Sequence, residues 1–190
     1  MMIEHLYSTP LYYAKVNDYE SINYHIDKSI DLVKFKEGYG GSTWKITTNF
    51  TVDKEPTILK DLRLNKLIKQ IDNHLKIYCS EINFDLRNGY KLHSWIAKCE
   101  PGDYVHVHQH ASSDLSGVYY YKTNEKDGDI YFQSPNPYLE VSKCYEARPW
   151  NHPPQVGKII IFPGWLRHGV THNKTDHTRI SVGFNIYFNQ

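Results

Sequence analysis

Two stretches in the first half of the chain show the apolar spacing of amphipathic helices. Segment 18–35 places isoleucine or valine every three or four positions, with charged residues on the other faces, at Ile22, Ile26, Ile30 and Val33. Segment 57–81 carries a second stripe, made of Leu64, Leu67, Ile68, Ile71, Leu75 and Tyr78. Asn17 or Asp18 could cap the first helix, and Pro56 suits the start of the second. We expect each helix to lay its stripe on a sheet.

The pattern changes after about residue 84, where short β-rich runs alternate with turn residues. Seven such runs predict a mainly β sandwich or barrel, at 91–100, 104–110, 116–123, 128–134, 138–144, 157–163 and 179–188. No repeat or low-complexity segment interrupts the chain. We therefore expect a single domain over 1–190, with a helical support region at 1–84 and a β core at 85–190.

Charge and composition narrow the classes of partner. The chain has 22 basic and 21 acidic side chains, so it has no general attraction to nucleic acid or to an acidic membrane. No stretch reaches the roughly 20 apolar residues of a membrane helix, and the N-terminus lacks the features of a signal peptide. Cys79, Cys99 and Cys144 lack metal-ligand spacing and suit a reducing cytoplasm. A small molecule or a protein side chain is the expected substrate, and no pattern indicates the oligomeric state.

The most informative stretch is Tyr-Val-His-Val-His-Gln-His at 104–110. On a regular strand, His106, His108 and His110 would share one face, with the intervening valines on the other. Neutral imidazole is a common nitrogen ligand of transition metals, and this spacing lets two rings reach one ion. A solvated histidine cluster is the alternative for this stretch alone.

Two further residues extend the constellation. His168 follows the apolar run 157–163 and the turn residues Pro163 and Gly164. In a jelly roll, residues from an early and a late strand can meet at the barrel mouth. Arg179 opens the last run, where it alternates with Ser181 on one face. A guanidinium that faces into a barrel needs an anionic partner, and the carboxylate of a small ligand is the natural candidate.

The ordered set H-x-H, LSGVYY, GKIIIFPGWLRH and RISVGFN resembles the 2-oxoglutarate and iron(II)-dependent oxygenase superfamily. It looks closest to a bacterial and phage branch with the SGVYY signature, and the likeness covers about residues 92–187. The resemblance implies a double-stranded β-helix (jelly-roll) core with the N-terminal helices packed on one sheet. It also implies Fe(II) and 2-oxoglutarate as cofactors. The implied activity is that of a hydroxylase-type dioxygenase.

The same resemblance assigns His108, His110 and His168 to the metal. His110 stands where the superfamily usually has a carboxylate, so this set departs from the common pattern. Asp114 could supply that carboxylate instead, and His106 could replace His108 if the register is shifted. The resemblance implies no catalytic residue beyond the ligands of the metal and the co-substrate.

The far carboxylate of 2-oxoglutarate is assigned by the resemblance to Arg179, helped by Ser181 and Tyr120. Tyr119 and Tyr121 are the alternatives to Tyr120 if the strand parity is reversed, and all three tyrosines could be plain strand residues. Two other functions stay open: a three-histidine cupin-like dioxygenase that does not use 2-oxoglutarate, and a jelly-roll module that binds a metal or ligand without catalysis.

Overall fold

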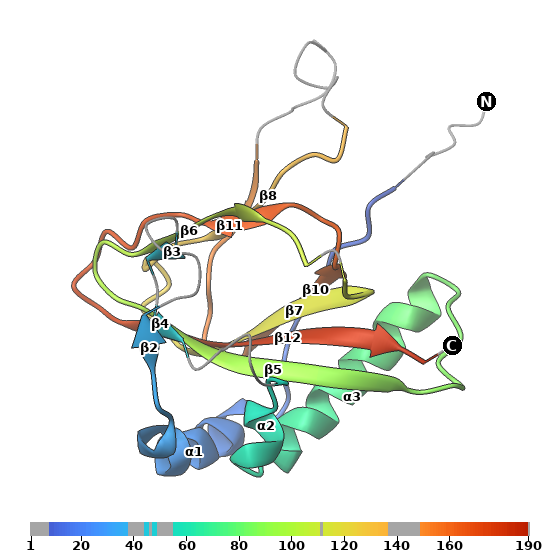
Figure 1. The fold of residues 1–190 in the computed structure, drawn as a ribbon, viewed down its shortest axis with the longest axis horizontal. Helices are drawn as coiled ribbons and strands as arrows, with labels where there is room; N and C mark the ends of the chain where they lie inside the picture. Colours follow the sequence, from blue (N-terminus) through green and yellow to red (C-terminus); the bar gives the residue numbers. More distant parts are fainter. Residues whose placement is uncertain are drawn as a thin grey trace.

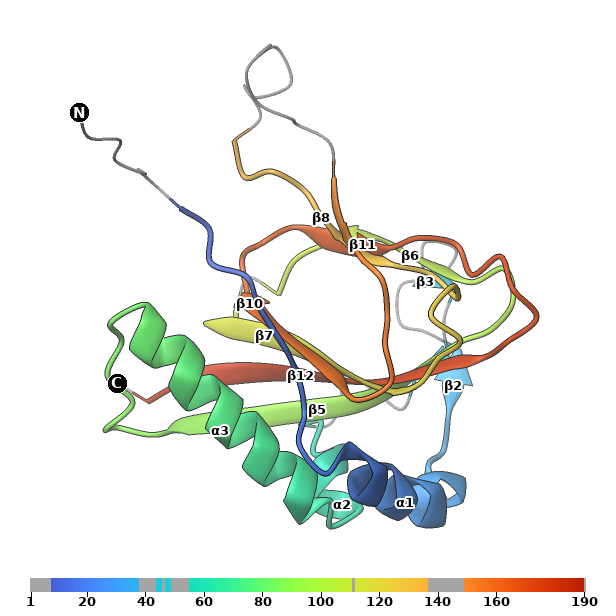
Figure 2. The same cartoon turned by 180° about the vertical axis from the view of Figure 1, so that it is seen from behind.

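Two antiparallel β-sheets face each other in a computed structural model that describes residues 8–37, 44–45, 47–48, 55–110, 112–136 and 149–189 (Figures 1 and 2). The larger sheet has the strand order β1-β10-β7-β12-β5-β4-β2, and the smaller has the order β3-β6-β11-β8-β9. All three α-helices lie on the outer side of the larger sheet (Figure 2). The expected mainly β architecture, a double-stranded β-helix with helices on one sheet, is confirmed.

The helical elements are α1 Tyr19–Ser29, the 3₁₀ turn η1 Ile30–Leu32, α2 Ile58–Asp61 and α3 Asn65–Glu81. The strands of the larger sheet are β1 Tyr12–Lys15, β2 Lys36–Glu37, β4 Thr47–Thr48, β5 Tyr90–Cys99, β7 Leu115–Lys122, β10 Lys158–Pro163 and β12 Arg179–Phe188. The strands of the smaller sheet are β3 Trp44–Lys45, β6 Tyr104–His108, β8 Ile130–Phe132, β9 Trp150–His152 and β11 His168–Val170.

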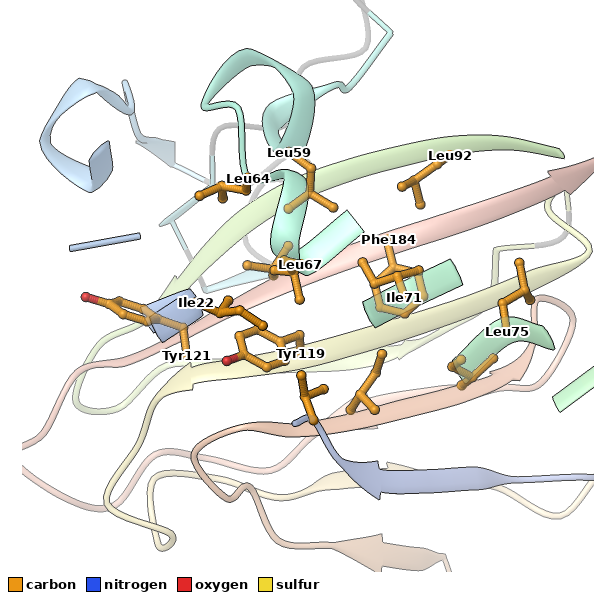
Figure 3. Packing of buried hydrophobic residues seen from close by; sticks show 14 of the residues in the cluster. Ile22, Leu59, Leu64, Leu67, Ile71, Leu75, Leu92, Tyr119, Tyr121 and Phe184 are labelled. Atoms are coloured by element: carbon orange, nitrogen blue, oxygen red, sulfur yellow. The ribbon is translucent and has the colours of Figure 1, made fainter. Parts of the chain in front are cut away.

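The main hydrophobic core lies between the helices and the larger sheet (Figure 3). The stripe predicted on the second helix supplies much of it, because Leu67, Ile71 and Leu75 of α3 are fully buried. Across from them, Tyr119 of β7 and Phe184 of β12 are also fully buried. This packing braces the outer face of the larger sheet and leaves its inner face for the site.

A second core fills the space between the two sheets. The sheet contributes to both cores because successive side chains of a β-strand point to opposite faces. On β10, Ile159 and Ile161 join the helix-side core, whereas Ile160 and Phe162 join the inner one. The even-numbered residues 180–186 of β12 likewise face the helices, so its odd-numbered residues, Arg179 among them, face inward.

Both predicted helices begin close to where they were expected; the second also ends at Glu81 as predicted, whereas the first ends earlier and the second is interrupted. The first stops as α1 and η1 at Leu32, because Val33 takes an extended conformation. Asp18 does occupy the N-cap position of α1, but its side chain makes no capping hydrogen bond. The second predicted helix divides into α2 and α3. Arg63, between them, has a φ of 52°, a left-handed conformation that no α-helix can continue through.

The short strands β1, β2, β3, β4, β9 and β11 were not among the predicted runs, since two to four residues are too few to show a period. The run predicted at 138–144, and Cys144 within it, lie outside the described residues. Cys79 and Cys99 are buried and free of disulfides. None of the helices in the described part of the chain is both long and apolar enough to cross a membrane.

Replacing Ile71 with alanine should lower the free energy of unfolding by about 2–5 kcal/mol, because the side chain is fully buried and its removal leaves a cavity. Ile77 on the same helix is 47% exposed, so Ile77→Ala should change stability by no more than about 0.5 kcal/mol. Urea denaturation followed by circular dichroism measures both. Equal losses in the two variants would mean that α3 does not pack as described.

Candidate metal centre

Two of the predicted ligands are direct neighbours in the smaller sheet. His108, the last residue of β6, pairs across the ladder with His168, the first residue of β11. Directly opposed residues bring their Cβ atoms within about 5 Å. The two ring centroids are accordingly 4.3 Å apart.

A β-bulge sets which side chains of β6 face inward. His168 pairs with His108 and Val170 pairs with Val105, so three residue steps on β6 oppose two on β11. The extra residue reverses the side-chain alternation. Val105 is therefore buried in a cluster with Cys99 of the larger sheet, and His106 is exposed. The prediction that His106, His108 and His110 line one face of a regular strand is wrong for this reason.

His110 reaches the same place from the loop that follows β6. Its backbone N–H donates to the carbonyl of Gly164 at 2.8 Å, and its carbonyl accepts from the backbone N–H of Ser113 at 2.8 Å. Gly164 is needed there, since a Cβ would lie 2.1 Å from the Ser113 carbonyl oxygen. The His110 ring lies 5.1 Å from that of His108 and 5.2 Å from that of His168, between centroids.

The three histidines offer one ligand atom each, and these atoms all lie within 4.8 Å of one another. This spacing allows one metal ion to bind all three. Neither rival joins the cluster. His106 packs edge-on against Tyr104, and exposed Asp114 accepts a hydrogen bond from the backbone N–H of Phe188 at 2.7 Å.

Hydrogen bonds fix the protons of two of the rings. Nδ1 of His108 donates to the carbonyl of His106 at 2.9 Å, and Nδ1 of His168 donates to the carbonyl of Leu166 at 2.8 Å. A carbonyl oxygen only accepts, so each neutral ring carries its proton on Nδ1. Nε2 of both rings is then left with the lone pair that a metal requires.

Burial keeps the cluster neutral. Loss of hydration lowers the pKa of His110 to about 3, with a further contribution from His108. Burial also lowers the pKa of His168 well below its ordinary value, and the pKa of His108 is lowered for the same reason. Ligand imidazoles must be deprotonated to bind a metal, so protons compete weakly with an ion here at neutral pH.

Arg179 lies deep in the barrel, where β12 begins, and only 4% of its surface is exposed. Its Nη1 donates to the carbonyls of Asp127, at 3.1 Å, and of Gly128. The Asp127 carboxylate instead accepts from Thr123 and from the ring of His177. Across the described residues, no carboxylate forms an ion pair with Arg179, and its buried Nε has no hydrogen-bond partner.

Ser181 and Tyr120 lie beside this guanidinium and are directly paired between β12 and β7. Both are buried, and Tyr120 belongs to the core between the sheets. Tyr119 and Tyr121 face the other way and donate to Asn23 and Asp27 of α1. Burial raises the pKa of Tyr120, an effect that Arg179 partly offsets.

Three residues near the site were not assigned to it from sequence. The ring of Trp95 stacks on that of His110, with centroids 5.7 Å apart and planes 20° apart, and Trp95 also packs against Gly183. Asn185 contacts the His110 ring. Lys158 is a second buried cation on the inner face of the larger sheet, and its Nζ donates to the carbonyl of Pro153 at 2.9 Å. The parity of β5, β10 and β12 could have indicated all three.

The sequence from 93 to 185, just under half of the chain, matches the family model described as "Putative 2OG-Fe(II) oxygenase". No curated protein matches the sequence. The fold is similar to that of a prolyl-4-hydroxylase from Pseudomonas putida, with a TM-score of 0.68, 9% identity and coverage of 97% of this chain and 95% of that one.

Two other solved structures share the fold. One is HygX from Streptomyces hygroscopicus with nickel and 2-oxoglutarate bound, with a TM-score of 0.66, 10% identity and coverage of 95% and 84%. The other is a Trichoplax adhaerens prolyl hydroxylase in complex with a hypoxia inducible factor peptide fragment, with a TM-score of 0.64, 14% identity and coverage of 96% and 86%.

The fold is a double-stranded β-helix, and three histidines converge inside it. The segment 93–185 is similar to the 2-oxoglutarate and iron(II)-dependent oxygenases, as the motifs predicted. These matches do not favour the two alternatives, a cupin-like dioxygenase that does not use 2-oxoglutarate and a jelly-roll binding module without catalysis. The narrower bacterial and phage branch stays a prediction.

The pKa shift of His110 should make the stability of the metal-free protein depend on pH. The folded pKa of about 3 lies below the ordinary histidine value of 6.5, so below pH 6.5 the unfolded chain binds a proton that the folded chain does not. The free energy of unfolding should therefore fall as pH drops from about 7 to about 5. The contribution of this one histidine is at most about 1.4 kcal/mol per pH unit, reduced by its partial exposure.

Urea denaturation across this pH range, compared between the native sequence and His110→Gln, measures that contribution. The variant should lose stability less steeply with acidification. Parallel profiles would show that His110 titrates normally in the folded protein.

Proposed function

We propose that this chain uses Fe(II) held by His108, His110 and His168 to couple the oxidative decarboxylation of 2-oxoglutarate to the oxidation of a substrate. The observation that carries the proposal is the convergence of three neutral histidines inside a barrel that also buries an arginine with an unpaired Nε. The bound ion and 2-oxoglutarate would supply the oxygen chemistry, and the protein supplies placement and shielding.

The donor set fits such an ion. Nitrogen ligands suit Fe(II), and three ligands on one side leave positions for a co-substrate. Three imidazoles add no negative charge, so the compensating charge would come from the two carboxylates of 2-oxoglutarate. Phe132 and Phe162 pack around the ring of His168, with centroid distances of 6.1 and 4.6 Å, and keep water from that side of the site.

Arg179 is the proposed anchor for the far carboxylate of 2-oxoglutarate. A buried N–H donor without a partner is costly, and a carboxylate oxygen would satisfy Nε. Ser181 and Tyr120 can offer hydroxyl groups beside it. The inward residues of β12 lead from Arg179 to Asn185, which contacts His110, so this strand connects the anchor with the metal cluster.

We further propose a small molecule or a protein side chain as the substrate. HygX has been solved with hygromycin B bound, and the Trichoplax hydroxylase with a peptide fragment, so barrels similar to this one admit either class. A cytoplasmic location, suggested by the two buried free cysteines, belongs to the same proposal.

A single domain over residues 1–190 is likewise a proposal. The larger sheet supports it, because strands from the N-terminal region pair with strands of the β core: β1 with β10, and β4 with β5.

Anaerobic titration with Fe(II) and 2-oxoglutarate should give a visible charge-transfer band. His168→Ala and His110→Ala should each abolish it and weaken metal binding by more than about 100-fold, the upper range for loss of an outer-shell partner. His106→Ala and Asp114→Ala are the matched controls and should retain the band, because neither side chain lies in the cluster. A band that survives in His168→Ala would remove His168 from the site.

Arg179→Gln should weaken 2-oxoglutarate binding at least tenfold while metal affinity stays within about twofold, because it removes a charge-assisted hydrogen bond and no ligand. Equilibrium dialysis with labelled 2-oxoglutarate measures the first quantity and chelator competition the second. Arg167→Gln, an exposed cation next to His168, controls for general charge effects. Unchanged 2-oxoglutarate affinity in Arg179→Gln, with a loss in Lys158→Gln, would make Lys158 the anchor instead.

A further inference from the structure

A chain of hydrogen-bonding groups runs from the ring of His110 through three buried side chains and back to the backbone carbonyl of His110. Nδ2 of Asn185 lies 3.2 Å from Nδ1 of His110, and Oδ1 of Asn185 accepts from Oγ of Ser116 at 2.5 Å. Oγ of Ser116 is 3.4 Å from Oγ of Ser113, whose hydroxyl donates back to the carbonyl of His110 at 2.9 Å. Asn185, Ser116 and Ser113 are all buried, so no water competes freely for these groups.

His110 differs from the other two histidines in what faces its Nδ1. His108 and His168 each face a carbonyl oxygen, which can only accept. His110 faces a side-chain amide, which can turn either its oxygen or its nitrogen toward the ring with almost no change of shape. The amide orientation therefore decides where the proton of neutral His110 resides.

The two orientations have opposite consequences for a metal. With the amide nitrogen toward the ring, Nδ1 accepts and the proton sits on Nε2, which is then unable to act as a ligand. With the amide oxygen toward the ring, Nδ1–H donates and Nε2 keeps its lone pair, as in His108 and His168. Nδ1 itself is covered by Asn185, so Nε2 is the ring nitrogen left for an ion.

The two serines can support the metal-competent orientation. In the structure the Ser116 hydroxyl donates to Oδ1 of Asn185, and Nδ2 faces His110. The metal-competent orientation is the same amide turned over, with its oxygen on His110 and with Nδ2 donating to Oγ of Ser116 at a distance longer than the present 2.5 Å. Ser116 then donates to Ser113, and Ser113 donates to the His110 carbonyl. In this direction both hydroxyls and Nδ1–H of His110 have an acceptor, as buried donors require.

We propose that Asn185 is the positioning residue for the third metal ligand: its amide oxygen accepts from Nδ1–H of His110, so that Nε2 is free of a proton and binds the metal, while the Ser116 hydroxyl accepts from the amide nitrogen. The role rests on the proposed function only in requiring an ion at the three histidines. It gives the ligand that replaces the usual carboxylate the same kind of outer-shell partner that the other two obtain from the backbone.

Metal affinity in two Asn185 variants separates positioning from simple packing. Zn(II) is the probe, measured by chelator competition. Asn185→Ala should weaken binding by about 10–100-fold. Asn185→Asp should restore it to the native value or better, because a carboxylate accepts from both Nδ1–H of His110 and the Ser116 hydroxyl and cannot donate to the ring.

Asn173→Ala is the matched control. Asn173 is another buried asparagine in the barrel, bonded to the carbonyls of Cys99 and His177 and remote from the cluster. It should lower the melting temperature and leave Zn(II) affinity within twofold. If Asn185→Ala does not fold, Ser116→Ala replaces it. This variant keeps Asn185 but removes the acceptor that its amide nitrogen needs in the metal-competent orientation, so it should weaken Zn(II) binding severalfold.

The tautomer can be observed directly. Nitrogen NMR of histidine-labelled, Zn(II)-loaded protein should show a proton on Nδ1 of all three ligands, His110 included. A proton on Nε2 of His110, or a metal on its Nδ1, would overturn the inference. So would an Asn185→Asp variant that binds as weakly as Asn185→Ala, or an Asn185→Ala variant that binds normally.

These failures are distinct from failure of the proposed function. If the native protein binds neither Zn(II) nor Fe(II) in a manner that His168→Ala abolishes, the metal site itself is refuted and the role of Asn185 with it. If the native protein binds metal and the Asn185 variants do not respond as described, only the positioning role is lost.

Discussion

The antiparallel pairing of β6 with β11 is the contact on which the site depends. It sets His108 opposite His168, 60 residues apart in sequence, and brings their rings to 4.3 Å. A slip of one residue would turn one of these side chains out of the barrel, since alternate residues face opposite ways. The bulge beside the pair has the same importance, because it turns His108 inward while His106 stays in solvent. The cluster of three histidines is thus a consequence of register, and His110 joins it from a loop whose backbone is hydrogen-bonded to Gly164.

The larger sheet serves as a wall with two different faces. Toward the helices it presents a continuous apolar surface that stabilises the fold, and toward the smaller sheet it presents Arg179, Ser181, Gly183 and Asn185 in succession along β12. Such a division lets the interior carry polar chemistry while folding is stabilised on the opposite side. The polar interior has an energetic cost. Burial lowers the pKa of His108, His110 and His168, and Nε of Arg179 has no hydrogen-bond partner among the described residues. Groups placed at such a cost are typical of a binding site.

Much of this arrangement could be predicted from local patterns. The stripe on the second helix, the long strands 91–100 and 179–188, and the inward parity of Tyr120 and Arg179 all follow from spacing of three to four or of two. The same spacing misled for the histidine run, where a strictly regular strand would have placed His106 with His108 and His110. A bulge leaves no mark in the period of a five-residue strand, so only the pairing with β11 reveals it. The break at Arg63 and the short strands were not predicted for a similar reason, since each depends on contacts with residues distant in sequence.

The amino-acid sequence alone determined the mainly β class of the fold and the likeness to an oxygenase family, because the order of the motifs and the alternation of apolar residues are properties of the chain itself. It also determined which side chains were available as ligands. The tertiary structure decided which of them meet. In it, His110 lies in the cluster and His106 and Asp114 do not. It also places Asn185 in contact with the ring of His110, and no local sequence pattern encodes this buried contact. The physical reason is that coordination and hydrogen bonding act over a few ångströms in space, and sequence patterns extend only as far as a single helix or strand.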